Sequence, residues 1–239
     1  MFGRFLELTI ATPDIAASVA FYERLGFRHL ITNDAWTHRY GVLSDGRIHI
    51  GLHERAMPSP AATFVRPGLA AARPRLRAAQ FEPEFERIGE AQLHELRLRD
   101  PGGQPVMLLE ARTYSPGLPA DGAESVCGYF LHLSLPQTDF VRAREFWERG
   151  GFVALPELDE PYLHLPLTSD GLNLGFHDRR LAPTPLLVFE CNDPVRQQAA
   201  LDSRALLPAK ELPRGMDAAR GVLLEAPEGT LLWSLPSRV

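Results

Sequence analysis

The chain has 239 residues, of which 45% are hydrophobic and 23% are charged, as is usual for a globular protein. A net charge of −5 and a pI near 5.9 argue against a nucleic-acid partner. Two cysteines cannot form a disulfide framework, and no apolar run approaches the roughly 18 residues of a membrane span. We therefore expect a cytoplasmic protein without a nucleic-acid or membrane partner, long enough for two domains.

A strand followed by a helix is predicted over residues 6–27, LELTIATPDIAASVAFYERLGF. Apolar residues alternate at Leu6, Leu8 and Ile10, which predicts that they share the strand face that packs on the helix. Asp14 has a side chain suited to an N-cap, and Gly26 can take the left-handed conformation that ends a helix. On the opposite strand face, Glu7 should point into a cavity.

Strands are predicted next near residues 36–43 and 47–53, joined by a Ser-Asp-Gly turn. Alternation in RIHIGLH (47–53) predicts that His49, Gly51 and His53 share the cavity side with Glu7. A second unit of the same kind begins near residues 61–65 and closes with the strand PVMLLEA at 105–111. Pro74 should shorten or kink the helix of this unit.

The second half of the chain repeats the first at an offset of about 125 residues. Residues 131–152, LHLSLPQTDFVRAREFWERGGF, align without a gap to residues 6–27, with eight of 22 positions identical. DGLNLGFHDR (170–179) likewise matches DGRIHIGLHER (45–55). The repeat predicts a domain over 1–112 with modules of about 1–57 and 58–112, a Pro- and Gly-rich linker over 113–127, and a domain over 128–239 with modules of about 128–181 and 182–239.

The opening stretch LTIATPDIAASVAFYERLGF and the closing LRDPGGQPVMLLE resemble the vicinal oxygen chelate superfamily, which includes glyoxalase I, bleomycin-resistance proteins and extradiol dioxygenases. The resemblance implies an α+β fold of four βαβββ modules. These modules would form two tandem glyoxalase-like domains, each with a curved mixed sheet around a cavity. It does not specify an activity, because the superfamily hosts many chemistries.

Members of this superfamily typically hold a divalent metal on the opening and closing strands of their modules. Carried over, these positions give Glu7 and His49 in the first domain, with non-ligating positions near Ala61 and at Met107. In the second domain they give His132 and Asn173, with non-ligating positions near Leu186 and at Trp233. A catalytic site generally needs about three protein ligands, so we expect no resident metal. If the alignment of the second module is shifted by a residue or two, His94 and Glu95 become further candidate ligands.

Structural roles compete with functional ones at several of these positions. His53 and His177 recur at equivalent places, each followed by an acidic residue, and either could simply close a strand end. Met107 and Trp233 suit core packing or a cavity wall for a flat apolar ligand. The predicted ligand-cavity residues are Glu7, His49, His53, Met107, His132, Asn173, His177 and Trp233; Glu7, His49 and His132 are the metal-ligand candidates.

Two functions follow from the resemblance. The first is metal-free binding of a small organic molecule, as in bleomycin-resistance proteins, because the closing-strand glutamates are missing. The alternative is a divalent-metal-dependent lyase or isomerase, or an extradiol-type dioxygenase. The duplication also predicts either a monomer with pseudo-twofold pairing of its domains or a homodimer.

Overall fold

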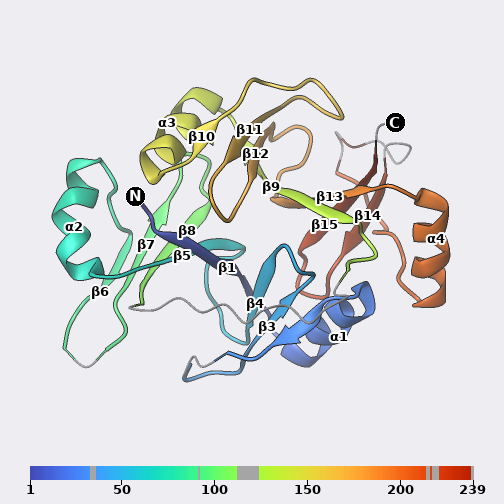
Figure 1. The fold of residues 1–239 in the computed structure, drawn as a ribbon, viewed down its shortest axis with the longest axis horizontal. Helices are drawn as coiled ribbons and strands as arrows, with labels where there is room; N and C mark the ends of the chain where they lie inside the picture. Colours follow the sequence, from blue (N-terminus) through green and yellow to red (C-terminus); the bar gives the residue numbers. More distant parts are fainter. Residues whose placement is uncertain (33–35, 91, 112–123, 214–215, 217–220, 238–239) are drawn as a thin grey trace.

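The computed structural model describes residues 1–239 except 33–35, 91, 112–123, 214–215, 217–220 and 238–239 (Figure 1). Most of the predicted linker, residues 113–127, therefore lies outside the described residues. None of the described helices combines the length and apolar character needed to cross a membrane.

The first sheet has eight strands in the order β2-β3-β4-β1-β5-β8-β7-β6. Its strands are β1 (Arg4–Ala11), β2 (Arg28–Leu30), β3 (Tyr40–Ser44), β4 (His49–His53), β5 (Ala61–Arg66), β6 (Phe85–Arg87), β7 (Glu95–Arg99) and β8 (Pro105–Glu110). Strand β1 lies in the middle, parallel to β4 and antiparallel to β5, so the sheet is mixed. The central place of β1 explains why its alternate side chains are deeply buried on both faces.

The second sheet repeats this arrangement with seven described strands in the order β10-β11-β12-β9-β13-β15-β14. They are β9 (Tyr129–Gln137), β10 (Val153–Ala154), β11 (His164–Thr168), β12 (Leu174–Asp178), β13 (Leu186–Cys191), β14 (Val222–Glu225) and β15 (Leu231–Pro236). The chain order is thus strand, helix and three strands in three modules, and strand, helix and two strands in the described part of the fourth. This confirms the predicted α+β fold of two tandem domains, each with a mixed sheet, and neither sheet is closed into a barrel.

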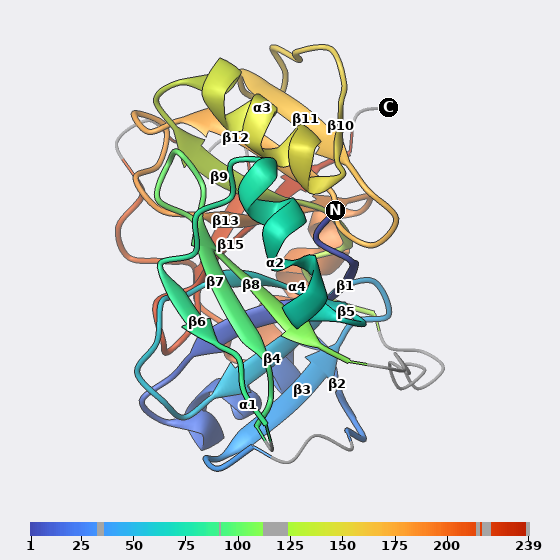
Figure 2. The same ribbon diagram turned by 90° about the vertical axis from the view of Figure 1, so that its left-hand side faces the viewer.

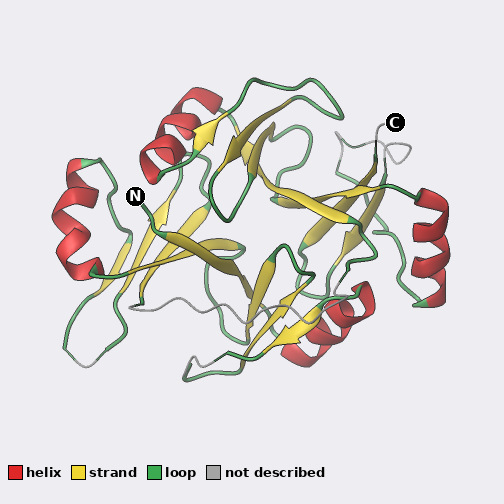
Figure 3. Ribbon diagram, in the orientation of Figure 1, coloured by secondary structure: helices red, strands yellow, loops and turns green. Residues whose placement is uncertain are grey.

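The helices are α1 (Ile15–Leu25), α2 (Leu69–Ala78), α3 (Phe140–Gly150) and α4 (Pro194–Ser203), and they lie around the outside of the strands (Figure 3). Asp14 and Asp139 accept hydrogen bonds from the first turns of α1 and α3, while Gly26 and Gly151 end them with positive φ. The predicted caps are therefore confirmed. Helix α2 continues through Pro74 and ends after 10 residues.

One hydrophobic core joins the helix-covered faces of both sheets. Phe2 packs on Phe64 and Phe81 of the first domain and on Phe146 and Trp147 of the second, at centroid distances of 4.9–5.9 Å. Helices α2 and α3 consequently lie side by side (Figure 2). The two domains are packed back to back, so the face of each sheet that is turned away from the helices, which we call its inner face, points away from this core.

A β-bulge at the start of β1 corrects one prediction. The pairing of β1 with β5 shifts between Phe5 and Glu7, which leaves Leu6 as the extra residue. Leu6 therefore packs on the inner-face cluster rather than with Leu8 and Ile10 on the helix side. The same shift occurs at Leu131 in the second sheet, so the bulge is a repeated feature of the fold.

Candidate functional site

A row of side chains crosses the inner face of the first sheet. The strand register aligns Glu7 on β1 with Thr63 on β5, Met107 on β8 and Arg97 on β7. Thr63 is two residues from the position expected near Ala61, which pairs with Thr9; the bulge accounts for one residue of this difference. The row therefore contains a carboxylate, a hydroxyl, a thioether and a guanidinium on four adjacent strands.

Glu7 is the centre of the polar part of this row. Its side chain is only 3% exposed. Tyr40 donates to Oε2 at 2.7 Å, while Thr9 and His53 donate to Oε1 at 3.1 and 3.2 Å. Gly51 makes room for the carboxylate, because a Cβ at that position would lie 2.2 Å from it. Both carboxylate oxygens are thus occupied by hydrogen bonds that compensate the burial of the charge.

Two hydrogen-bonded chains lead into Glu7. Since Thr9 gives its proton to the carboxylate, its oxygen accepts from Thr63 at 2.6 Å. His53 donates from Nε2, so in its neutral form its Nδ1 accepts from His38 Nε2 at 2.9 Å. Burial, with smaller contributions from His53 and Arg55, lowers the pKa of His38 and so favours the neutral form of the His38 ring.

An apolar cluster lies beside this network on the same inner face. Its buried members are Ala61, Val65, Met107 and Leu109, with Leu6, Trp36, Met57 and Ala111 packed against them. Trp36 Nε1, in this cluster, is buried and has no hydrogen-bond partner among the described residues. Arg97 lies beside the cluster with its guanidinium over Phe85 at 3.9 Å, and its Nε is 3.5 Å from Glu95 Oε1. The inner face therefore combines apolar surface with one indole N–H that lacks an acceptor among the described residues and with an arginine that is already ion-paired.

The equivalent place in the second domain is built around His132. Its ring lies over Gly175, where a Cβ would approach it to 2.8 Å, as Glu7 lies over Gly51. His132 Nε2 is 2.8 Å from the Tyr162 hydroxyl, which donates to Ser134 at 3.1 Å. Ser134 Oγ is in turn 2.7 Å from His177 Nδ1, so four polar groups form one chain.

The end of this chain fixes its direction. His177 Nε2 lies 3.0 Å from the Ala182 carbonyl, which can only accept, so Nε2 carries the hydrogen and Nδ1 accepts from Ser134. Tyr162 then donates to Ser134 and accepts from a hydrogen on His132 Nε2. Burial lowers the pKa of His132 to about 3 and that of His177 to about 4, so both rings are neutral at pH 7.

Tyr162 also fills the inner face of the second sheet. Its ring stacks on Trp233 at 5.2 Å and belongs to a buried apolar cluster with Leu186, Val188 and Leu223. Tyr162 is 5% exposed and Trp233 1% exposed. The predicted ligand-cavity residue Trp233 is therefore covered by a side chain of the protein itself.

His49 and Asn173 share a structural contact that neither sequence role anticipated. His49 Nδ1 lies 3.2 Å from the carbonyl of the bulge residue Leu6, and Asn173 Nδ2 lies 3.3 Å from that of Leu131. Each side chain thus satisfies a carbonyl that the bulge removes from the ladder. His49 does not contact Glu7, and Asn173 is exposed, so the structure does not bring these candidates together with Glu7 or His132.

The donor sets do not fit a divalent metal. The strand positions beside Glu7 hold Thr63 and Met107, and those beside His132 hold Val188 and Trp233, with Val188 replacing the expected Leu186. The His132 nitrogen that faces the cluster carries a hydrogen. His94 pairs with Glu110, and Glu95 pairs with Arg87, so a shifted register adds no ligand. Within the described residues, no three His, Cys, Asp or Glu side chains converge as metal ligands do.

Several residues of these networks were not predicted. Arg97 could have been found from the alternation in ELRLR (95–99), which puts Leu96 and Leu98 in the core and Arg97 opposite them. Trp36 and His38 lie in the part of the predicted strand near 36–43 that precedes β3, and their alternation with Tyr40 is a signal that could have placed them on one face. Tyr162 lies in an irregular segment before β11, and no local signal in the sequence marks its approach to the sheet.

Comparisons with solved structures assign the fold. Catechol 2,3-dioxygenase matches with a TM-score of 0.57 and 15% identity, over 98% of this chain and 92% of that chain. Homoprotocatechuate 2,3-dioxygenase from Arthrobacter globiformis matches with 0.62 and 14%, over 98% and 80%. For 2,2',3-trihydroxybiphenyl 1,2-dioxygenase from Sphingomonas wittichii the values are 0.60 and 15%, over 98% and 90%.

No family model and no curated protein matches the sequence. The chain shares the fold of these dioxygenases. At this identity the likeness concerns architecture, and the activity has to be argued from the side chains.

Proposed function

We propose that the first domain binds a small organic molecule on its inner face without a catalytic metal. The observation that carries this proposal is the hydrogen bonding of Glu7. Its two carboxylate oxygens already accept three hydrogen bonds from the protein, and the row of side chains that crosses the sheet at Glu7 contains no second metal ligand. A carboxylate held in this way acts as a fixed acceptor that orders Tyr40 and His53. It leaves the apolar cluster beside it as the binding surface.

The unpartnered indole N–H favours a ligand that carries an acceptor group. A buried N–H group without a partner costs free energy, which a ligand oxygen at Trp36 Nε1 would recover, while Arg97, already paired with Glu95, would add a positive charge nearby. Met107 and Leu109 are 2% and 5% exposed and pack against Leu6, Trp36 and Met57, so the ligand's apolar part would reach them by displacing one of these side chains. The second domain, whose inner face is filled by Tyr162, would then serve to support the first.

The test joins elemental analysis with thermal unfolding. Protein purified without chelator should hold less than about 0.1 equivalent of any transition metal per chain. A panel of phenols, aromatic acids and dicarbonyl compounds should contain members that raise Tm before and after treatment with chelator. A ligand at 100 times its Kd should add about 2.7 kcal/mol to the free energy of unfolding.

Trp36→Phe provides the matched variant, because it keeps the ring and removes the unpartnered donor. It should weaken binding of the ligand that raises Tm, while the stability of the ligand-free protein stays the same or increases slightly. Trp147→Phe, in the shared core, is the control, because it removes an indole N–H far from the first inner face. If the two variants weaken ligand binding equally, the proposed binding surface is wrong.

The alternative is a divalent-metal-dependent enzyme of the extradiol dioxygenase or glyoxalase type, favoured by the shared fold. It requires stoichiometric metal and oxygen consumption with catechol, or turnover of a dicarbonyl compound, and abolition of that activity by Glu7→Gln. We also propose a cytoplasmic location, with which the buried free thiols Cys127 and Cys191 agree. A monomer with internally paired domains is the proposed assembly, to be tested by mass measurement in solution.

A further inference from the structure

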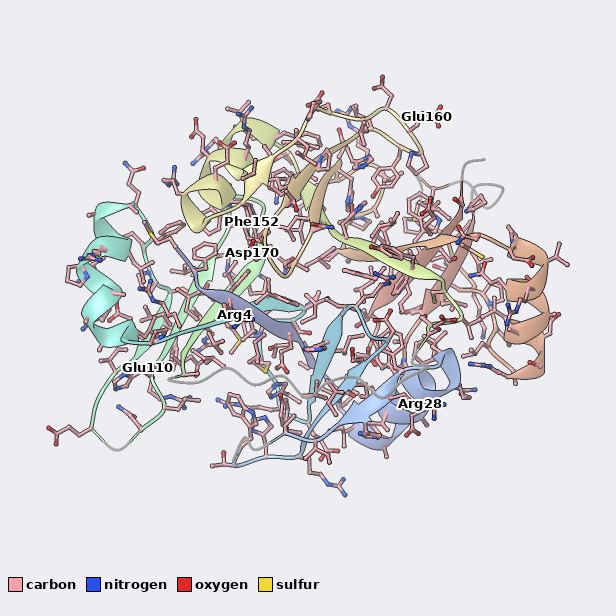
Figure 4. The ribbon with its side chains drawn as sticks, viewed as in Figure 1. Arg4, Arg28, Glu110, Phe152, Glu160 and Asp170 are labelled. Carbon is pink, nitrogen blue, oxygen red and sulfur yellow. The ribbon has the colours of Figure 1, made fainter. Side chains whose placement is uncertain are left out.

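A cavity of about 740 Å³ lies at the junction of the two domains. It is formed by the starts of β1 and β4, the end of α3 and the turn between β11 and β12, and Figure 4 shows Arg4, Phe152 and Asp170 around it. Neither Glu7 nor Trp233 lines it. Its size falls within the roughly 300–1,000 Å³ of small-molecule pockets, so we asked which chemistry its walls would recognise.

Three phenylalanines form the apolar part of the wall. Phe5 meets Phe64 edge-on at a centroid distance of 5.8 Å, and Phe64 meets Phe152 edge-on at 6.1 Å. Phe5 and Phe64 come from the first domain, and Phe152 follows α3 in the second. Phe64 and Phe152 are 2% and 4% exposed, so an aromatic ligand would pack mainly on the half-buried Phe5 ring and touch only a small part of the other two.

The charged part of the wall is predominantly positive. The Arg47 guanidinium is placed 3.6 Å from the centre of the Tyr129 ring, so it is oriented without being neutralised by that contact. Arg4 adds a second positive charge, and Asp170 is the one carboxylate residue among the lining residues. A planar guanidinium beside an apolar wall suits the two-pronged recognition of a carboxylate.

His49 contributes a hydrogen-bonding group of defined polarity. The Leu6 carbonyl can only accept, so His49 Nδ1 carries the hydrogen of that 3.2 Å contact. Nε2, with no partner among the described residues, is left as an acceptor in the neutral ring. The sequence had placed His49 with Glu7, whereas the structure places it in the wall of this cavity.

We propose that this cavity is a second binding site, for a small aromatic carboxylate. The ring packs against Phe5, Phe64 and Phe152, the carboxylate pairs with Arg47, and a ring hydroxyl, where present, donates to His49 Nε2. The site is separate from the first inner face and does not depend on ligand binding there.

The test is a ¹⁹F NMR titration of the full chain with 4-fluorobenzoate, with 4-fluorobenzamide as the neutral probe of the same shape. The carboxylate should bind about tenfold more tightly than the amide, because only the anion forms the charge-assisted pair. Arg47→Gln should abolish this difference, and Arg47→Lys should keep part of it. Asp170→Asn should tighten binding of the anion by removing a repulsive charge. Arg47 and Asp170 are exposed, so these variants should fold, which circular dichroism checks.

Arg97→Gln is the control that separates the two sites, because Arg97 lies on the first inner face. It should leave the Arg47-dependent preference for 4-fluorobenzoate over 4-fluorobenzamide unchanged, even where it weakens binding at the first inner face. Loss of binding in Arg97→Gln with none in Arg47→Gln would assign the anion to the inner face and overturn the proposal. Absence of binding to the unmodified chain up to about 10 mM probe would overturn it as well.

Discussion

Tyr22 on α1 donates a 2.8 Å hydrogen bond from its hydroxyl to Glu228 in the turn between β14 and β15, so a helix of the first domain is tied to the closing turn of the second. Trp147 on α3 occupies the position equivalent to Tyr22, and its indole Nε1 donates at 3.0 Å to Asp100 in the closing turn of the first domain. The two contacts are reciprocal. Each closing turn presents a carboxylate to a buried aromatic donor of the opposite helix, which fixes the back-to-back packing of the domains.

Trp147→Phe tests this packing. The substitution keeps an aromatic ring but removes a donor to Asp100, which is buried and retains Gln137 as a side-chain partner at the same oxygen. We expect the free energy of unfolding to fall by about 1–3 kcal/mol, since a buried acceptor loses a charge-assisted bond. Urea denaturation measures the change. Tyr129→Phe, on a half-exposed ring, should alter stability by less than about 0.5 kcal/mol.

Gly51→Ala should distort the first inner face. The new methyl group would lie 2.2 Å from the Glu7 carboxylate, which three hydrogen bonds hold in place. We expect a loss of about 1–3 kcal/mol, as in overpacked cores. Gly41→Ala, on the neighbouring strand β3, is the matched control, because a Cβ there meets nothing within 4 Å. Equal stability of the two variants by thermal unfolding would contradict the packing described around Glu7.

Three buried histidines of the second domain, His132, His164 and His177, predict a loss of stability in acid, because burial lowers the pKa of each ring. In the folded chain the pKa of His132 is lowered to about 3 and that of His177 to about 4, against 6.5 in the unfolded chain. Below pH 6.5 the unfolded chain therefore binds protons that the folded chain does not. Their contribution is complete above pH 6.5 and is lost as the pH falls toward 4, by about 1.4 kcal/mol per pH unit for each histidine.

Urea denaturation at a series of pH values measures this slope. The double variant His132→Gln/His177→Gln should show a shallower pH dependence between pH 6 and 4.5 than the unmodified chain. The absolute stability of the double variant will fall because its substitutions break the hydrogen-bond network around Tyr162. The prediction therefore concerns the change in the free energy of unfolding with pH, not its value at one pH. His29→Gln, at a half-exposed position, should keep the full slope. An unchanged slope in the double variant would show that these rings are protonated in the folded protein.

Tyr162→Ala should open a cavity against Trp233. Removing a ring that stacks at 5.2 Å and links His132 to Ser134 should cost about 3–5 kcal/mol. Phenol carries the missing ring and hydroxyl, so we expect it to bind the variant, raise its Tm and change the fluorescence of Trp233, with no such effect on the unmodified chain. Toluene, which lacks the hydroxyl, should raise the Tm of the variant by less than phenol does. Failure of both compounds would mean that the space closes when the ring is removed.

The repeat and the alternation of apolar residues predicted most of the fold. They gave the helix caps at Asp14 and Gly26, the duplication and the inner-face positions of Glu7, His53, His132 and His177, because these depend on local periodicity. The row across the sheet lies two residues from the predicted position near Ala61, and a bulge at Leu6, which leaves no mark in the sequence, accounts for one of these residues. The short strand β2 was not predicted, because its three residues are too few to show a period.

The partners of the candidate residues were beyond the reach of local patterns. Tyr40 and His53 reach Glu7 from β3 and β4, and the donor that fills the second domain, Tyr162, comes from an irregular segment before β11. Such contacts join residues about 30–46 positions apart in the chain. The change from Glu7 to His132 is explained only by these partners: one network converges on a charge, and the other passes hydrogens along to a backbone carbonyl.

The single core beneath both helix layers limits which substitutions the chain can accept during evolution. A domain whose inner face no longer receives a ligand cannot be discarded, because its helices complete the interior of its twin. Selection can therefore relax on the ligand-facing residues of that copy while it remains strict on the buried residues behind them. Tyr162 shows the freedom of the second inner face, since it fills that face against Trp233 without entering the core shared with the first domain.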